Sequence, residues 1–153
     1  DKGAIVPSTI GKELALYVVY YSPMQMAADL PKHYSKHMDA FQFIKNVPVD
    51  WSERKILNSE FREYVSMARK DKSSENWYVG GITNENERDL KIDFSFLESG
   101  KEYTMKMYLD TQNTHWKENP MEYQITEREV SSNDNIDIYL APGGGFAIEI
   151  IAK

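Results

Sequence analysis

The chain has 153 residues, and its 24 acidic and 18 basic side chains give a net charge of −6 with no cysteine. The missing cysteine excludes disulfides, thiolate metal sites, iron–sulfur clusters and a cysteine nucleophile. The negative charge argues against binding to nucleic acids or to anionic membranes, and no apolar run approaches the roughly 20 residues that span a bilayer. With 41% hydrophobic and 12% aromatic residues, the composition predicts a globular chain and leaves its activity open.

The first third of the chain has the pattern of two helices separated by a short apolar segment. Ser8 or Thr9 is a typical N-cap, and apolar residues then surround nearly the whole first helix as far as Tyr21. We therefore expect this helix to be buried on several sides. Pro23 ends it, and the apolar segment that follows is a strand or a loop. The second helix is predicted over residues 34–46.

From Val49 onward the apolar residues recur at every second position, which is the period of half-buried strands. The clearest example runs from Leu90 to Phe96, and polar or glycine-containing turns separate it from its neighbours. About eight such strands predict a mainly β fold, an antiparallel β-sandwich preceded by two helices. The alternation places the following residues in the sandwich core: Trp77, Ile92, Phe94, Phe96, Met105, Met107, Ile138, Leu140, Phe146 and Ile148.

No group of residues has the spacing of a known catalytic motif. Carboxylates are scattered, and neither an HExxH nor a GxSxG motif occurs. His33 and His37, with Asp29 before them, could share a helix face, but a proline interrupts that turn, so we expect solvated histidines rather than a metal site. Gly143–Gly145 is expected to form a hairpin turn, and Gly80–Gly81 a bulge or a close backbone approach. We assign no catalytic residue and no metal ligand to the chain.

Of the three tryptophans, Trp116 is the one that suggests ligand binding. It lies in a polar loop, where an indole ring can stack on a sugar or pack against the end of the sandwich. Trp77 lies within a strand and is expected in the core. Trp116 is therefore the candidate for sugar stacking, with packing as the alternative.

Several longer strings in this sequence resemble glycoside hydrolase family 97, and together they cover nearly the whole chain. Members of that family are α-glucosidases and α-galactosidases with an N-terminal super-sandwich, a (β/α)8 barrel and a C-terminal β-sandwich. One departure is Gly80–Gly81, where Gly-Ala is more usual. The strings that carry the resemblance are Leu14–Pro31, Phe41–Lys45, Val47–Trp51, Ala68–Lys70, Trp77–Thr83, Phe96–Leu97 and Ala141–Gly145.

The resemblance implies that residues 1–47 are the end of a catalytic barrel and that residues 48–153 are the C-terminal β-sandwich domain. Met26 and Asp29 would then lie at the rim of the parent's substrate pocket, since the active sites of such barrels lie at the C-terminal ends of the strands. The family's catalytic and calcium-binding glutamates lie upstream and correspond to no residue here. The chain, which begins at Asp1, is thus expected to be a processed protein or a piece of a longer enzyme.

The resemblance therefore implies a non-catalytic C-terminal domain of a calcium-dependent α-glycosidase, periplasmic or extracellular. It would support its own barrel and N-terminal domain, take part in a homo-oligomer, and leave hydrolysis of an α-linked oligosaccharide to the parent. The alternative is a carbohydrate-binding sandwich, and a third hypothesis is an independent enzyme. Because cutting the barrel would uncover the first helix, we also expect the chain to self-associate through Leu14, Tyr17, Val18 and Tyr21.

Overall fold

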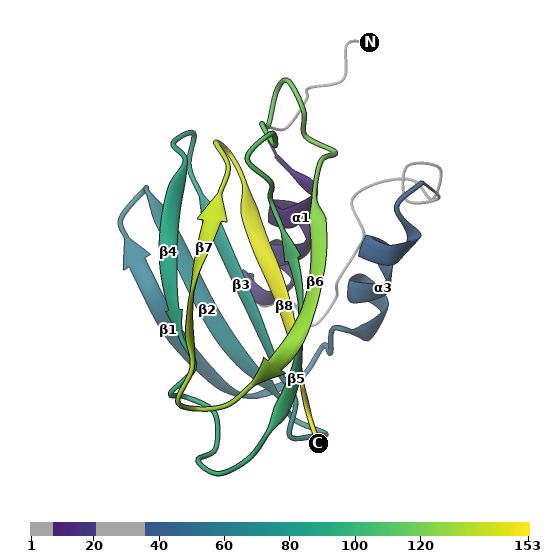
Figure 1. Ribbon diagram of the computed structural model, residues 1–153, viewed down its shortest axis with the longest axis vertical. Coiled ribbons are helices and arrows are strands. Elements are labelled where there is room, and N and C mark those ends of the chain that lie inside the picture. The colour runs from purple at the N-terminus through teal and green to yellow at the C-terminus, as the bar shows by residue number, and fades with distance from the viewer. Residues whose placement is uncertain (1–7, 21–35) are drawn as a thin grey trace.

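The computed structural model describes residues 8–20 and 36–153 of the chain. In that part, a six-stranded antiparallel sheet of order β1-β2-β3-β8-β5-β6 forms the middle of the molecule, and a two-stranded sheet, β4-β7, lies on one face of it. The helices lie on the opposite face, as Figure 1 shows with β4 and β7 in front of the large sheet and α1 behind it. The result is three layers, with apolar residues between each pair of layers.

The elements follow one another in the order that the sequence predicts. They are α1 (Ile10–Val19), α3 (Met38–Asn46), β1 (Trp51–Glu60), β2 (Tyr64–Asp71), β3 (Trp77–Thr83), β4 (Arg88–Asp93), β5 (Tyr103–Leu109), β6 (Gln124–Val130), β7 (Asn135–Leu140) and β8 (Gly145–Ala152). The predicted fold class, mainly β with two preceding helices, is confirmed. Neither described helix is long and apolar enough to cross a membrane.

Strand β4 is shorter than the alternation predicts. It ends at Asp93, whose carboxylate accepts a hydrogen bond from the Ser95 N–H at 2.8 Å, and the Leu97 N–H then bonds to the Phe94 carbonyl at 3.0 Å. The chain therefore turns while Phe94 stays fully buried. An alternating pattern can thus continue into a turn without remaining a strand.

The core between the two sheets contains the residues that the alternation predicts. Nine of the ten are buried, and Phe96 is partly buried with its ring centroid 4.9 Å from that of Trp77. Residues from β4 and β7 face residues from β3, β5 and β8 across this layer. The period-two pattern therefore identifies the inner face of the large sheet correctly.

A second core on the outer face of the large sheet overturns one expectation. Leu14 and Val18 of α1 are buried against the chain's own sheet, with Phe43 of α3 beside them, so the expectation that this helix face is uncovered and drives self-association is wrong. The helix comes this close because Gly80 faces it, and a Cβ there would lie 2.8 Å from the Ala15 carbonyl oxygen. Tyr17 is partly buried in the same cluster, and Tyr21 lies outside the described residues.

The predicted boundary between residues 47 and 48 falls in the connection between α3 and β1. Its assignment to a barrel on one side and a sandwich on the other stays a prediction.

Candidate functional site

A buried carboxylate joins the start of α1 to the sheet. Asp110 directly follows β5 and is 2% exposed. Its Oδ1 accepts a hydrogen bond from the Thr9 hydroxyl at 3.0 Å, and its Oδ2 accepts the backbone N–H groups of Ala141 at 3.0 Å and Gly145 at 2.9 Å. Thr9 is also the N-cap of α1, since its hydroxyl accepts the Lys12 N–H at 3.2 Å. One side chain therefore holds the first turn of the helix against the β7–β8 turn.

The surroundings of Asp110 set its protonation. Burial raises the pKa of this carboxyl to about 6, although the hydrogen bonds from Ala141, Gly145 and Thr9 and the nearby Lys12 ammonium oppose that shift. Burial likewise lowers the pKa of Lys12, whose Nζ donates to the Thr83 carbonyl at 3.3 Å. The helix start thus depends on a carboxylate that is costly to ionise and on a cation next to it.

A second buried charge holds the other end of α1. Arg69 of β2 is 5% exposed, and its Nε donates to the Val18 carbonyl at 2.6 Å while its Nη2 donates to the Val19 carbonyl at 3.3 Å. These carbonyls belong to the last turn of the helix, where they lack partners within the helix and where a cation is favoured by the helix dipole. Both ends of α1 are therefore attached to the sheet through charged side chains.

Helix α3 is attached to the same face through aromatic contacts. The ring of Phe43 meets those of Tyr78 and Tyr108 edge-on, with centroids 6.0 and 5.3 Å apart. The Tyr78 hydroxyl donates to the Asn46 carbonyl at 3.2 Å, and the Tyr123 hydroxyl donates to Asp39. The two helices that flank residues 21–35 are therefore both fixed on the large sheet.

Sequence reasoning did not find this arrangement, although two signals were present. Arg69 lies within a strand, and Asp110 directly follows one. Each needs a buried partner if its strand is covered on both faces. The sequence does not show that β2 and β5 are covered on their outer face. The partner of Arg69 lies 51 residues away in the chain and that of Asp110 lies 101 residues away, so no local pattern links them.

The loop tryptophan packs against the chain itself. Trp116 is half-buried over the turn at Gly143, where a Cβ would lie 2.7 Å from the Trp116 Cβ. The backbone N–H of Trp116 donates to the Pro142 carbonyl at 3.3 Å. Gly143 has φ of 66°, as expected for a glycine in this turn. These contacts favour the packing alternative, and sugar stacking by Trp116 stays a prediction.

The other residues singled out from the sequence give no ligand site. Met26, Asp29 and His33 lie outside the described residues. His37 packs against Tyr123, with ring centroids 5.5 Å apart. Over residues 8–20 and 36–153, no three histidine, aspartate or glutamate side chains come together to hold a metal ion.

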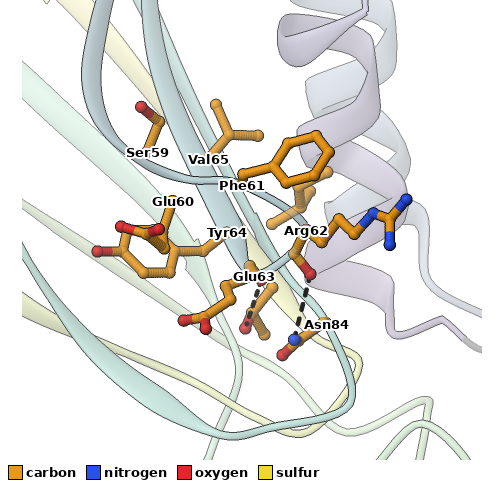
Figure 2. Close-up of a pocket in the computed structure, with 10 residues that line it drawn as sticks. Ser59, Glu60, Phe61, Arg62, Glu63, Tyr64, Val65 and Asn84 are labelled. Carbon is orange, nitrogen blue, oxygen red and sulfur yellow. Dashed lines mark hydrogen bonds between the residues drawn. The ribbon is translucent and has the colours of Figure 1, made fainter.

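A pocket lies at the end of the β1–β2 hairpin, and its lining includes Thr83, whose carbonyl accepts a hydrogen bond from the Lys12 Nζ at the start of α1. It has a volume of about 550 Å³, and its lining includes Phe61, Val65 and Ile82. Figure 2 shows Phe61, Arg62 and Val65 on one side of the hairpin and Tyr64 on the other. The Phe61 side chain is 82% exposed, the largest value among the exposed large hydrophobic residues of the described part of the chain.

The chain matches one known protein family and is similar in sequence to known proteins. Residues 50–151 match the family described as glycosyl-hydrolase 97 C-terminal, oligomerisation. A retaining alpha-galactosidase from Bacteroides thetaiotaomicron is 36% identical over 139 residues, which make up 91% of this chain and 20% of that protein. The chain therefore spans about a fifth of the length of that relative.

The solved structures agree with this match. A glycoside hydrolase family 97 enzyme from Pseudoalteromonas sp. strain K8, in complex with panose, has a TM-score of 0.93 and 41% identity over 96% of this chain and 23% of its own. A beta-arabinopyranosidase shares the fold, with a TM-score of 0.70 and 23% identity over 89% of this chain and 20% of its own. The likeness to the first of these includes both helices as well as the sheets, because it covers nearly the entire chain.

Proposed function

The chain belongs to the glycosyl-hydrolase 97 family, whose C-terminal oligomerisation domain it contains, and from this premise we propose that its β-sandwich supports the catalytic barrel of a longer α-glycosidase. The resemblance that the sequence suggests is confirmed. In this proposal residues 1–47 are the end of the barrel, residues 48–153 are the support domain, and neither part carries out catalysis by itself.

The observation that carries the proposal is the attachment of both helices to the outer face of the large sheet. Asp110 holds the start of α1, Arg69 holds its end, and Phe43 of α3 packs on Tyr78 and Tyr108. If the helices are the last two of a barrel, these contacts fix the end of the barrel on the sandwich. Residues 21–35, which include Met26 and Asp29 at the proposed rim of the substrate pocket, then join two elements with set positions.

The parent's substrate is proposed from the relatives. One relative is described as a retaining alpha-galactosidase and another was solved with panose, so an α-linked oligosaccharide is the proposed substrate class. Within the described residues no three acidic or histidine side chains come together, and the family resemblance places the parent's calcium-binding glutamates upstream of this chain. Calcium, if the parent uses it, would bind to residues outside the described part of this chain. We propose a periplasmic or extracellular location on the family resemblance.

The first experiment asks whether the chain hydrolyses glycosides. The 153-residue chain is incubated with aryl α-galactosides and aryl α-glucosides in the presence of calcium. We expect no turnover above a buffer blank, because the family resemblance places the catalytic glutamates upstream of this chain. Turnover that survives repurification would contradict a purely supporting role.

The second experiment tests support directly in a full-length enzyme that contains this chain. Arg69→Met removes both hydrogen bonds to the end of α1, and Lys91→Ala, a change at an exposed side chain of β4, serves as the control. We expect Arg69→Met to lower the Tm and kcat/KM together, since loosening the contact between α1 and the sheet should disturb the barrel. A variant that loses stability while kcat/KM at a temperature well below its Tm stays at the control value would refute the proposed support.

A further inference from the structure

The β1–β2 hairpin exposes apolar surface that its own chain does not cover. Among the described residues, six large hydrophobic side chains are exposed: Tyr20, Met38, Val49, Ile56, Phe61 and Met121. Three of these lie within residues 50–151, the range that matches the oligomerisation domain, and two of the three, Ile56 and Phe61, lie on β1 and the turn after it. The hairpin is therefore the main apolar feature on the surface of the matched domain.

Four residues form what we call the hairpin patch: Ile56, Phe61, Val65 and Ile82. Val65 of β2 pairs with Ile82 of β3, so these two side chains lie on the same face of the sheet. Val65 also shares its face with Arg69, which binds α1, because the two are four positions apart in one strand. The hairpin patch thus lies on the outer face of the sheet beside the start of α1, where the Lys12 Nζ donates to the carbonyl of Thr83, the residue after Ile82.

The turn that carries Phe61 is rigidly held. Arg62 has φ of 62°, and the Glu63 N–H bonds to the Glu60 carbonyl at 3.0 Å. Asn84, from the loop after β3, donates its side-chain amide to the Arg62 carbonyl at 3.3 Å and its backbone N–H to the Glu63 carbonyl at 2.8 Å. Figure 2 shows the contacts between Asn84 and this turn. The backbone that carries the ring is therefore fixed before a partner binds, so burial of the ring has to order only its own side-chain torsions.

The shape of this surface suits a second copy of the same surface. Phe61 is 82% exposed and forms one wall of a pocket whose lining also includes Val65 and Ile82. A two-fold contact requires one surface to be complementary to itself, so a ring and a pocket side by side allow each copy to fill the other's pocket. The same pocket is lined by Glu60 and Arg62, which make no ion pair within the described residues, so the rim offers both signs of charge to a partner.

Strand pairing at this edge is disfavoured, which leaves side chains to make the contact. β1 is an edge of the six-stranded sheet, and its pairing with β2 has register shifts between Trp51 and Glu53 and between Ile56 and Asn58. Bulges and charged side chains on an edge strand oppose the addition of another strand. A partner would therefore meet the hairpin through Phe61 and the pocket rather than through backbone hydrogen bonds.

We propose that the hairpin patch is the contact through which this domain meets a second copy of the chain across a two-fold axis. The proposal rests on the oligomerisation role of the family and names the surface that performs it. Phenylalanine and arginine are both enriched at protein–protein interfaces, and Phe61 and Arg62 lie next to each other at the tip of this turn. Three further exposed apolar residues lie on or next to the helices: Tyr20, Met38 and Val49. In this proposal they contact the parent's barrel and take no part in the two-fold contact.

Sedimentation of the 153-residue chain at micromolar concentration is the first test. We expect a dimer for the wild-type chain, a weakening of about 30-fold or more for Phe61→Glu, as for the loss of an aromatic hot spot, and a smaller weakening for Phe61→Leu. Met38→Glu on α3 is the matched control, because it places the same charge at another exposed apolar side chain, and it should leave the dimer intact.

Cross-linking gives a second, independent readout, since the chain contains no cysteine. Ser59 is exposed and lines the pocket, so Ser59→Cys places one thiol beside the proposed two-fold axis. Under a mild oxidant we expect this variant to form a disulfide-linked dimer, and Met38→Cys to stay largely uncoupled.

The outcomes separate this inference from the proposed function. A dimer that Met38→Glu breaks and Phe61→Glu leaves intact would overturn the hairpin contact while the oligomerisation role stands. A wild-type chain that is monomeric, together with a monomeric full-length enzyme, would overturn both. If the full-length enzyme is a dimer, Phe61→Glu could leave it a dimer and lower its Tm. That result would mean that the enzyme's own domains cover the hairpin, and the inference would fail.

Discussion

The two faces of the six-stranded sheet are buried by different means. The inner face meets β4 and β7 through apolar side chains, with Phe94, Phe146 and Ile148 fully buried among them. The outer face also buries apolar residues, but its helix is held at its two ends by Asp110 and Arg69. The inner layer therefore owes its stability to packing, whereas the outer layer adds a charged joint that responds to pH and to single polar substitutions.

The largest expected effect is on the inner face. Phe94→Ala removes a fully buried ring, so it should lower the free energy of unfolding by about 3–5 kcal/mol. Urea denaturation followed by fluorescence measures this loss. A loss below about 1 kcal/mol would mean that this face is not the tightly packed one, and the comparison would have to be reversed.

The next effect is on the outer face, and it depends on hydrogen bonding rather than on volume. Asp110→Ala leaves the N–H groups of Ala141 and Gly145 buried without their acceptor, which should cost about 2–4 kcal/mol. Asp110→Asn keeps a carbonyl oxygen for both N–H groups and offers its amide to Thr9, and it removes a buried charge. We expect this variant to differ from the wild type by about 1 kcal/mol or less. Equal losses in the two variants would refute the hydrogen-bonding explanation.

The dependence of stability on pH sharpens the comparison. The pKa of Asp110 is raised to about 6 in the folded chain and lies near 3.9 when the chain is unfolded. Between about pH 4 and pH 6 the folded state therefore holds the extra proton, and the free energy of unfolding should fall as the pH rises, by at most about 1.4 kcal/mol per pH unit.

The difference between the wild type and Asp110→Asn isolates this contribution. Asp39 also contributes to the pH dependence of stability, because the hydrogen bond from Tyr123 lowers its pKa and its stabilising contribution is therefore lost as the pH falls. Both proteins share this contribution, so it cancels in the difference between their free energies of unfolding. Denaturation midpoints of both proteins at several pH values provide the measurement. Parallel curves for the two would show that Asp110 does not titrate in this range.

The smallest effect concerns one hydroxyl within the outer core. Among the described residues, the buried Tyr108 hydroxyl has no hydrogen-bond partner. Tyr108→Phe keeps the ring that meets Phe43 and removes a polar group whose burial is costly, so stability should stay the same or rise by about 1 kcal/mol. If the Tm of Tyr108→Phe is several degrees lower than that of the wild type, the hydroxyl has a stabilising hydrogen-bond partner, and this prediction is wrong.

The sequence predicts the inner face well because its signal is local. In strand β5, Met105 and Met107 are predicted as core residues from the alternation, and both pack in the core between the sheets. The outer face is not predicted, because nothing near Tyr78 or Tyr108 in the sequence says that helices 30 to 100 residues away cover these side chains. The sequence pattern of α1, apolar nearly all round, does indicate burial, but it does not name the partner.

The residues of the candidate site are likewise predictable only where the sequence signal is local. Ser8 or Thr9 is predicted as the cap from its position before an apolar helix, and the structure shows that Thr9 is the cap. Asp110 and Arg69 are missed because a lone acid and a lone arginine have no signature until their distant partners are known. Trp116, the sugar-stacking candidate, packs on a glycine turn that only the folded chain brings to it.

Hydrogen exchange tests most directly the central claim that helix α1 and the sandwich form one stable unit. The amides of α1 around Val18 and those of β8 around Ile148 are compared in the 153-residue chain at neutral pH. If the joint holds the helix on the sheet, both sets should open with the same global unfolding, with protection factors within about tenfold of each other. Exchange in α1 faster than in β8 by more than about 100-fold would show that the helix detaches by itself, and it would contradict the account.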